Sequence, residues 1–138
     1  MIRTGERVFM DTGAWIALAI VRDSMHERAV ETWTTLLEAG ARPVVSVPVL
    51  LETFSYLQRK VSQEVAARWW ESLGRVRFLD RIECTAAELN AAMKFFQRRE
   101  LYKLSLVDAT SFVLMRKHKL RVAFSFDTHF AVAGFRLA

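Results

Sequence analysis

The stretch Val8-Phe9-Met10-Asp11-Thr12-Gly13-Ala14-Trp15 changes character at its centre. Residues 8–10 form an apolar run typical of a short buried strand, and residues 14–20 continue as an apolar helix. Asp11 therefore stands where a strand ends and a helix begins. A carboxylate that ends a buried strand needs a partner, because an isolated buried charge is costly. This segment predicts an α/β fold with a polar site at one edge of its sheet.

Strand-like runs alternate with helical patterns along the rest of the chain. The expected strands cover residues 8–10, 44–47, 76–79, 122–124 and, at the end, 135–137. The first two expected helices cover residues 14–20 and 25–39, the second after Asp23-Ser24 as a cap. The next two begin at Pro48 and after Ser62. The last two run from a Thr85 capping box through Phe96 and from Ser105 to near Lys117. This alternation predicts a three-layer α/β/α sandwich with a central parallel sheet.

Length and composition predict one domain, residues 1–138. The chain is 52% hydrophobic and 25% charged, with only 5 Gly and 2 Pro, as expected for a globular protein without linkers. The apolar run at residues 14–21 is shorter than the ~20 residues that a membrane span needs. No signal peptide is recognisable, and the single cysteine, Cys84, fits a reducing compartment. We expect a cytoplasmic protein without a membrane segment.

Three further acids share the placement of Asp11. Glu52 and Asp108 lie near helix starts, and Asp127 follows the strand at 122–124. In open parallel sheets, ligands bind beyond the carboxyl ends of the strands, where helices also begin. All four carboxylates are therefore expected on the same rim of the sheet, which predicts a metal site.

A set of oxygen ligands indicates the chemistry of this site. Hard divalent cations such as Mg²⁺ and Mn²⁺ prefer oxygen donors. Without a cation, four acids within a few ångströms would repel one another, and some would stay protonated. A bound ion can activate water and stabilise charge on a phosphoryl oxygen. The predicted reaction is hydrolysis of a phosphodiester.

Individual acids also have structural interpretations. Asp108 ends a Ser-x-x-Asp pattern and could simply cap its helix, and Asp127 could cap a short turn. Glu52 could pair with Arg59 or Lys60, which follow it on the same helix. Taken jointly, the four positions favour a metal site.

The charge balance fits a polyanionic substrate. Lys and Arg number 20 against 15 Asp and Glu, a net charge of +5, and 15 minus the four proposed ligands leaves 11 acids elsewhere. A basic exterior around an acidic pocket suits a polyanion that is held by its phosphates. A basic protein that is merely soluble is the alternative on charge alone.

Four blocks of sequence together resemble a known family. They are residues 8–15, Val49-Leu50-Leu51-Glu52-Thr53, Leu106-Val107-Asp108-Ala109 and Ser125-Phe126-Asp127-Thr128-His129-Phe130. On these blocks, and on residues 23–29, the chain resembles the PIN-domain ribonucleases, and specifically the VapC toxins of type II toxin–antitoxin modules, over essentially its full length.

This resemblance implies a Mg²⁺- or Mn²⁺-dependent endoribonuclease that cleaves RNA, a homodimer, and a cognate VapB-like antitoxin whose C-terminal segment blocks the site. It assigns Asp11 and Asp108 as principal metal ligands, Glu52 and Asp127 as acids that complete the catalytic pocket directly or through water, and Thr12 and Ser125 as supporting hydroxyls.

Candidate RNA contacts lie near the acidic residues in the sequence. Arg98, Arg99 and Lys103 join one helix end to the helix that carries Asp108, so they could bind RNA phosphates. An ordinary exposed helix terminus is the alternative for them. His129, two residues after Asp127, could touch the substrate or brace the pocket.

Two rival functions share these motifs. A PIN nuclease that serves RNA maturation without an antitoxin would carry the same acids. A nucleic-acid-binding module with an idle site would bind RNA whether or not a metal is present. Phosphotransfer through an acyl phosphate at Asp11 is disfavoured, because the residue two positions on is Gly13 rather than a second acid.

Overall fold

The computed structural model describes residues 2–138 and contains a five-stranded parallel sheet in the order β3-β2-β1-β4-β5. The strands are β1 (Arg7–Met10), β2 (Arg42–Ser46), β3 (Asp80–Ile82), β4 (Val122–Phe124) and β5 (Arg136–Leu137). Phe9 in the central strand pairs with Val44 of β2 on one side and with Ala123 of β4 on the other. The predicted parallel sheet is confirmed.

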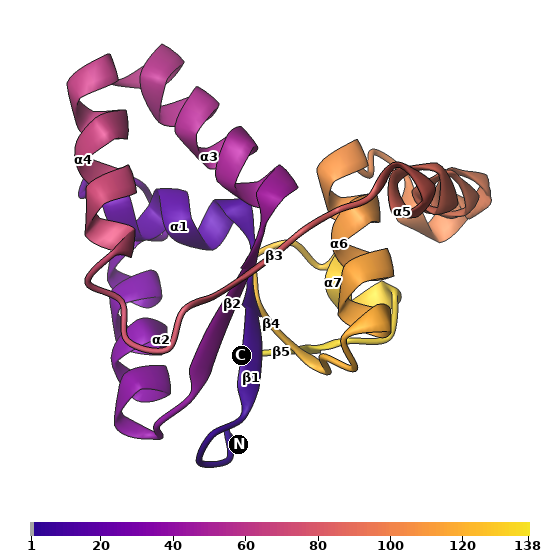
Figure 1. Cartoon of the computed structure of the whole chain (residues 1–138), viewed down its shortest axis with the longest axis horizontal. Helices are drawn as coiled ribbons and strands as arrows, with labels where there is room; N and C mark the ends of the chain where they lie inside the picture. Colours follow the sequence, from indigo (N-terminus) through magenta and orange to yellow (C-terminus); the bar gives the residue numbers. More distant parts are fainter. Residues whose placement is uncertain (1) are drawn as a thin grey trace.

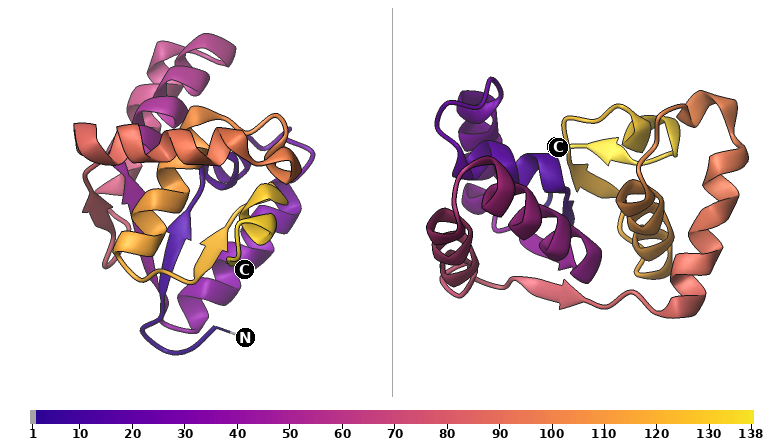
Figure 2. Two further views of the ribbon diagram at one scale, coloured as in Figure 1. Left: turned by 90° about the vertical axis from the view of Figure 1, so that its right-hand side faces the viewer. Right: turned by 90° about the horizontal axis from the view of Figure 1, so that it is seen from above.

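Helices cover both faces of the sheet. They are α1 (Thr12–Ala19), α2 (His26–Glu38), α3 (Val47–Lys60), α4 (Gln63–Leu73), α5 (Ala86–Ala91), α6 (Leu106–Lys117) and α7 (His129–Val132), with 3₁₀ segments η1 (Ala92–Gln97) and η2 (Arg99–Leu101). Figure 1 shows α1, α2 and α4 to the left of the sheet and α5, α6 and α7 to its right. Seen from above, the segment from β3 to α5 joins the two sides (Figure 2). The α/β/α sandwich is confirmed.

The order of the strands reverses beside β1. From β1 the chain moves outward through β2 to β3, and it then returns to place β4 and β5 on the other side of β1. Because crossovers between parallel strands are right-handed, a change of direction moves the connecting helices to the opposite face. A crevice for ligands is therefore expected between the carboxyl ends of β1 and β4.

Aromatic side chains fill the core between the sheet and α6. The Phe112 ring lies 5.2 Å from that of Phe95, 5.0 Å from that of Phe130 and 5.8 Å from that of Phe135, measured between centroids. Phe9 of β1 joins them through Phe130 at 6.4 Å. Because this cluster ties α6 to the sheet, it fixes the helix that carries Asp108.

Helix starts follow the predicted capping residues. The hydroxyls of Ser62 and Ser105 each accept a hydrogen bond from a backbone N–H in the first turn of the helix that follows. Thr85 and Glu88 form the reciprocal capping box, at 2.8 and 3.1 Å. At α3 the cap is Ser46, so Val47 begins the helix instead of ending the strand.

The third strand differs from its prediction. Residues 76–79 form a turn, and β3 follows at residues 80–82. Phe78 has a φ of +59°, a left-handed conformation outside the β region of regular strands. Val76 and Phe78 instead line a surface hollow with Trp33 and Leu37. Phe78 is 61% exposed, so the apolar run indicated neither a strand nor a buried segment at that residue.

Two helix boundaries also differ from expectation. The helix that starts at Ala86 ends at Ala91 and continues as the 3₁₀ segment η1 rather than as an α-helix through Phe96. Asp23 does not cap α2 directly, because its carboxylate accepts the N–H of Met25, which is itself the N-cap residue. Neither difference moves an acid away from the rim.

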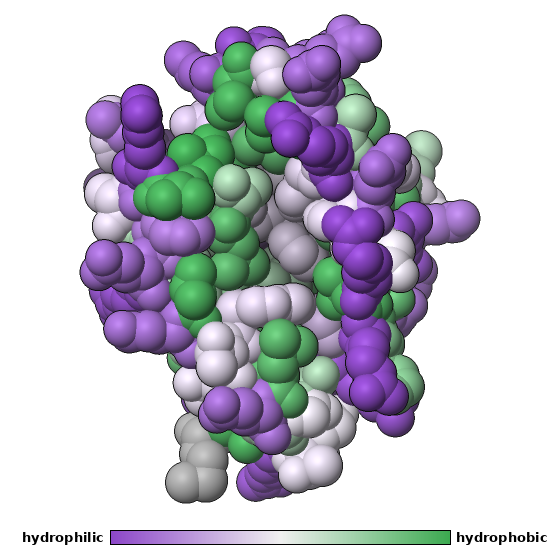
Figure 3. Space-filling view, turned by 90° about the vertical axis from the view of Figure 1, so that its left-hand side faces the viewer, coloured by the Kyte–Doolittle hydropathy of each residue, from purple (hydrophilic) through white to green (hydrophobic). Residues whose placement is uncertain are grey.

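The face formed by α2 and α4 carries a band of apolar side chains between charged ones (Figure 3). Two adjoining hollows of about 530 and 360 Å³ lie there, and both are lined by Trp33 and Val76. Trp15 packs beneath this face against Trp33 and Trp69, with centroids 5.9 and 6.0 Å away. Within residues 2–138, none of the helices combines the length and apolar character that crossing a membrane requires.

Candidate active site

Asp11 lies at the crevice where the strand order reverses. Its N–H donates to the carbonyl of Phe124 at 3.0 Å, which extends the β1–β4 pairing by one residue. Its side chain is only 5% exposed. One carboxylate oxygen accepts the N–H of Thr12, and the other accepts the Ser125 hydroxyl, both at 2.8 Å. Asp11 is thereby fixed as the N-cap of α1 and as the floor of the crevice.

Ser125 links two of the acids. Its hydroxyl donates to Asp11 and accepts the N–H of Asp127 at 3.0 Å. Asp127 in turn accepts the N–H of His129 at 2.9 Å, and Nδ1 of His129 lies 3.0 Å from the same carboxylate. The segment after β4 therefore holds Asp127 from both sides, and His129 braces it.

Asp108 enters the pocket from α6. The capping bond runs from its backbone N–H to Ser105, so its side chain is free of that role, and the residue is 8% exposed. Glu52 enters from α3, and no ion pair joins it to Arg59 or Lys60 within residues 2–138. The structural alternatives for these two acids therefore find no support in the contacts.

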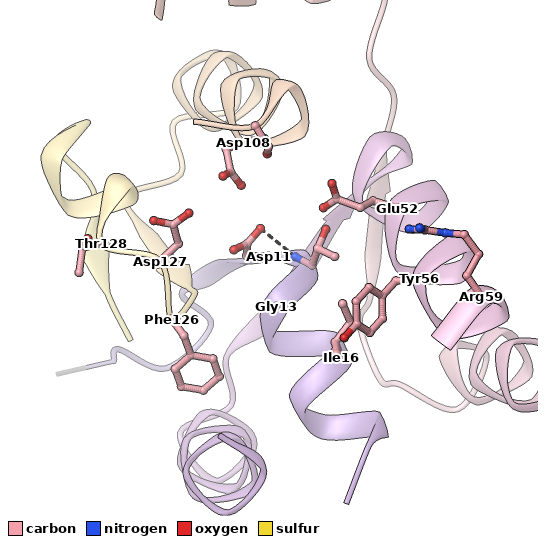
Figure 4. A pocket seen from close by; sticks show the side chains of 12 residues that line it. Asp11, Gly13, Ile16, Glu52, Tyr56, Arg59, Asp108, Phe126, Asp127 and Thr128 are labelled. Carbon is pink, nitrogen blue, oxygen red and sulfur yellow. Dashed lines mark hydrogen bonds between the residues drawn. The ribbon is translucent and has the colours of Figure 1, made fainter. Parts of the chain in front are cut away.

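All four predicted acids line one open pocket of about 690 Å³ (Figure 4). They come from the ends of β1 and β4 and from α3 and α6. Within the described chain, Asp108, Asp127 and His129 form a group that could hold a metal ion, with one ligand atom of each within 4.8 Å of the others. Asp11 lies between this group and Glu52, which enters the same space from α3 (Figure 4).

The carboxylates are poorly compensated in the absence of a cation. Burial first, and then the charges of Asp11 and Asp127, together raise the pKa of Asp108 to about 8. Burial also raises the pKa of Asp11 to about 6, against the hydrogen bonds from Ser125 and Thr12, which lower it. At neutral pH the pocket therefore retains a proton that a bound cation would displace.

These raised pKa values predict that stability falls with pH when divalent ions are removed. The folded protein keeps protons on Asp11 and Asp108 that the unfolded chain, with pKa values near 3.8, releases. Their stabilising contribution is thus complete below pH 3.8 and is lost as pH rises through about 6 and about 8. Urea unfolding in EDTA should give a lower free energy of unfolding at pH 8 than at pH 5. A rise over that interval would contradict the assignment.

The two predicted supporting residues contact Asp11, whereas the three predicted basic RNA contacts lie away from the pocket. Ser125 supports Asp11 through its hydroxyl, whereas Thr12 does so through its backbone N–H. Arg98 pairs with Glu100 at 2.8 Å. The predicted basic RNA contacts, Arg98, Arg99 and Lys103, are absent from the pocket lining within the described chain.

Sequence reasoning missed the second wall of the pocket. Tyr56 and Arg59 line it from α3, and Phe126 lines it from the segment after β4. Tyr56 and Arg59 follow Glu52 by four and seven residues, a spacing that places all three on one face of a helix. Once Glu52 is assigned to the site, this spacing alone predicts that Tyr56 and Arg59 lie on the same side of the helix as the site.

Comparison with known proteins identifies the family of this chain. The PIN domain family model matches residues 8–136. A curated relative, the 23S rRNA-specific endonuclease VapC20 of Mycobacterium tuberculosis (strains CDC 1551 and H37Rv), is 35% identical over 131 residues, covering 93% of this chain and 95% of the relative. The chain therefore belongs to the PIN-domain family. Within that family it is a VapC-type nuclease, as the sequence motifs predicted.

Solved structures show the same relationship. The crystal structure of Mycobacterium tuberculosis VapC20, described as a Sarcin-Ricin loop cleaving toxin, superposes with a TM-score of 0.80 at 30% identity, covering 93% of this chain and 95% of that one. VapBC2 from Rickettsia felis, bound to a DNA fragment from its promoter, matches with a TM-score of 0.67 at 12% identity over 96% of this chain and 97% of that one. The second likeness concerns the fold alone.

Proposed function

We propose that this protein is a Mg²⁺- or Mn²⁺-dependent endoribonuclease and the toxin of a VapBC-type module. The observation that carries the proposal is the convergence of Asp11, Glu52, Asp108 and Asp127 from four separate segments on one pocket. No packing requirement brings four carboxylates together, and their mutual repulsion opposes it.

The residues present fit a hard divalent cation. The donors are carboxylate oxygens, which Mg²⁺ and Mn²⁺ prefer. Burial raises the pKa values of Asp11 and Asp108, and nearby carboxylates raise them too, so a cation bound beside them would be stabilising. The buried hydroxyl of Thr12, which lines the pocket, has no hydrogen-bond partner within residues 2–138. A water bound to the metal would supply such a partner.

Each acid has a role that its surroundings support. Asp11 and Asp108, the two most buried, would hold the metal, and Glu52 and Asp127 would complete the pocket directly or through water. When bound, a divalent ion activates water and neutralises charge on the phosphate. Ser125 keeps the Asp11 carboxylate oriented, which is the usual role of a hydrogen bond to a metal ligand.

Several observations support RNA as the substrate and a toxin role. The relatives at 30% identity or more are named as a 23S rRNA endonuclease and as a toxin that cleaves the Sarcin-Ricin loop. The excess of 20 basic residues over 15 acidic ones suits a polyanion. Cellular RNA as substrate and Cys84 as a free thiol are consistent with the cytoplasm as its compartment. A cognate VapB-like antitoxin that blocks the pocket follows from the toxin role.

A homodimer is supported by an apolar surface next to the active site. Leu51 of α3, Leu89 of α5 and Leu106 of α6 are 64%, 42% and 44% exposed. They border a hollow of about 370 Å³, which Glu52 also lines. Exposed apolar patches of this kind mark association surfaces. Analytical ultracentrifugation of the purified protein and of Leu51→Glu should show a dimer that the substitution disrupts.

The test of function is cleavage of a mixed RNA pool by the purified protein with Mg²⁺, with Mn²⁺ or with EDTA. Cleavage that needs a divalent ion is the expected result. Cleavage that survives EDTA would overturn the metal dependence. Tight RNA binding with no cleavage under any condition would favour a binding module with an idle site. Coexpression of a small reading frame encoded beside the gene should suppress the activity of a toxin. A nuclease of RNA maturation would not be suppressed.

A further inference from the structure

One wall of the active-site pocket is a single face of α3. Glu52, Tyr56 and Arg59 lie on it in that order, and all three line the pocket. Figure 4 shows the guanidinium of Arg59 directed back along the helix toward Glu52. This wall therefore presents an acid, an aromatic ring and a guanidinium that extends back toward the acid.

Arg59 is the cation that lines this pocket in the described part of the chain. Within residues 2–138 it forms no ion pair, and its side chain makes no hydrogen bond. A free guanidinium presents five N–H donors in a planar fork that matches phosphate oxygens.

The pocket has room for more than an ion. Its volume of about 690 Å³ extends from the acids to two aromatic rings, Tyr56 and Phe126 (Figure 4). Between them lie Gly13 and Ile16 of α1, and a Cβ added at Gly13 would meet no atom within 4 Å. Phe126 is held edge-on against Phe124, at 5.8 Å between centroids. The non-acidic end of the pocket is thus open and flanked by aromatic rings.

We propose that Arg59 binds an RNA phosphate next to the scissile one and that Tyr56 contacts the base of the same nucleotide. This inference rests on the proposed function. Bases of an A-form duplex are stacked and inaccessible, whereas unpaired bases stack on aromatic side chains. The site therefore takes an unstacked nucleotide, as found in single strands and loops. Arg59 also offsets the repulsion between the RNA backbone and the four carboxylates.

The binding test uses the non-cleaving Asp108→Asn protein in Mg²⁺ and a short fluorescent single-stranded RNA. Fluorescence anisotropy gives Kd at KCl concentrations between about 50 and 200 mM. Adding Arg59→Ala should weaken binding about tenfold and reduce the slope of log K against log [salt] by about 0.7, the value for one phosphate contact on a single strand. Arg59→Lys should keep the slope, because it keeps the charge.

Lys60→Ala is the matched control. Lys60 is exposed, adjacent to Arg59 and in the same last turn of α3, but it does not line the pocket. Lys60→Ala removes the same net charge as Arg59→Ala and the same favourable interaction with the helix dipole. An equal effect of Arg59→Ala and Lys60→Ala on both affinity and slope would overturn the assignment of Arg59.

The base contact is tested by cleavage kinetics. Tyr56→Ala should raise KM for a loop RNA about tenfold with a smaller change in kcat, while Tyr56→Phe stays near wild type, because stacking needs only the ring. If the wild type cleaves RNA and Tyr56→Ala and Tyr56→Phe both have its KM and kcat, the base contact is ruled out and the proposed function stands. If the wild type does not cleave RNA, the proposed function fails, and an altered salt slope in Arg59→Ala would still support the phosphate contact.

Discussion

Asp108→Asn is expected to reduce RNA cleavage by about 10³-fold or more, at the upper end of the loss for one electrostatic group in an active site. The substitution removes a charge and keeps the shape of the side chain. It also keeps the start of α6, because Ser105 accepts the backbone N–H of this residue. Gel-based cleavage assays in Mg²⁺ should show the loss, and circular dichroism should show unchanged helix content.

The same variant should be more stable than the wild type when no divalent ion is present. Burial and the charges of Asp11 and Asp127 disfavour the Asp108 carboxylate, and an amide is not subject to that penalty. Urea unfolding at pH 8 in EDTA should show a gain of about 1–2 kcal/mol, typical for relieving a destabilised functional site. Below pH 4 the gain should vanish, since the wild-type carboxyl is then protonated.

Asp80→Asn is the control for both measurements. Asp80 is an exposed acid at the start of β3, where it pairs with Arg7 on the surface at 3.1 Å. The chemical change is identical, but the site lies outside the pocket. Cleavage should persist and stability should change by less than about 1 kcal/mol. Loss of cleavage in both variants would contradict a specific role for Asp108.

Phe112→Ala is expected to lower the free energy of unfolding by about 3–5 kcal/mol. Phe112 is fully buried among three other phenylalanine rings, so truncation leaves a cavity that the surrounding rings fill only partly. It lies one helical turn after Asp108 on α6, so cleavage should weaken as well. Urea unfolding measured by tryptophan fluorescence gives the stability directly.

Phe112→Leu keeps the experiment informative if the alanine variant fails to fold. Leucine retains much of the apolar volume, so the loss should be about 1–2 kcal/mol. Leu37→Ala on α2 is the contrasting variant. Leu37 is 48% exposed, so its truncation should lower the free energy of unfolding by less. Equal losses at Phe112 and Leu37 would show that the phenylalanine cluster does not dominate the core.

The sequence predicted those parts of the fold that depend on local chemistry. The change from strand to helix around Asp11 depends on the hydrophobic pattern and on a capping side chain. Both depend only on residues that are close in the sequence. The capping box at Thr85 was predicted for the same reason. The rim position of the four acids followed from the general geometry of parallel sheets.

The third strand could not be placed by local pattern. Val76 and Phe78 of its apolar run line a surface hollow beside α2, while the residues that pair with β2, Asp80–Ile82, include two charged side chains. An edge strand is defined by its partner's hydrogen bonds rather than by its own hydrophobicity. Arg59 was missed for a related reason, since its relevance depends on which face of α3 meets the pocket.

The central position of β1 has a consequence for incompletely folded chains. Asp11 and Glu52 belong to the first 60 residues, whereas Asp108 and Asp127 belong to the last 31. The two groups meet only when β4 pairs with β1. A chain in which either half is unfolded or cut away therefore has an incomplete set of acids. Under the proposed function, RNA cleavage would require both halves to be folded and paired, and local opening of either half would abolish it.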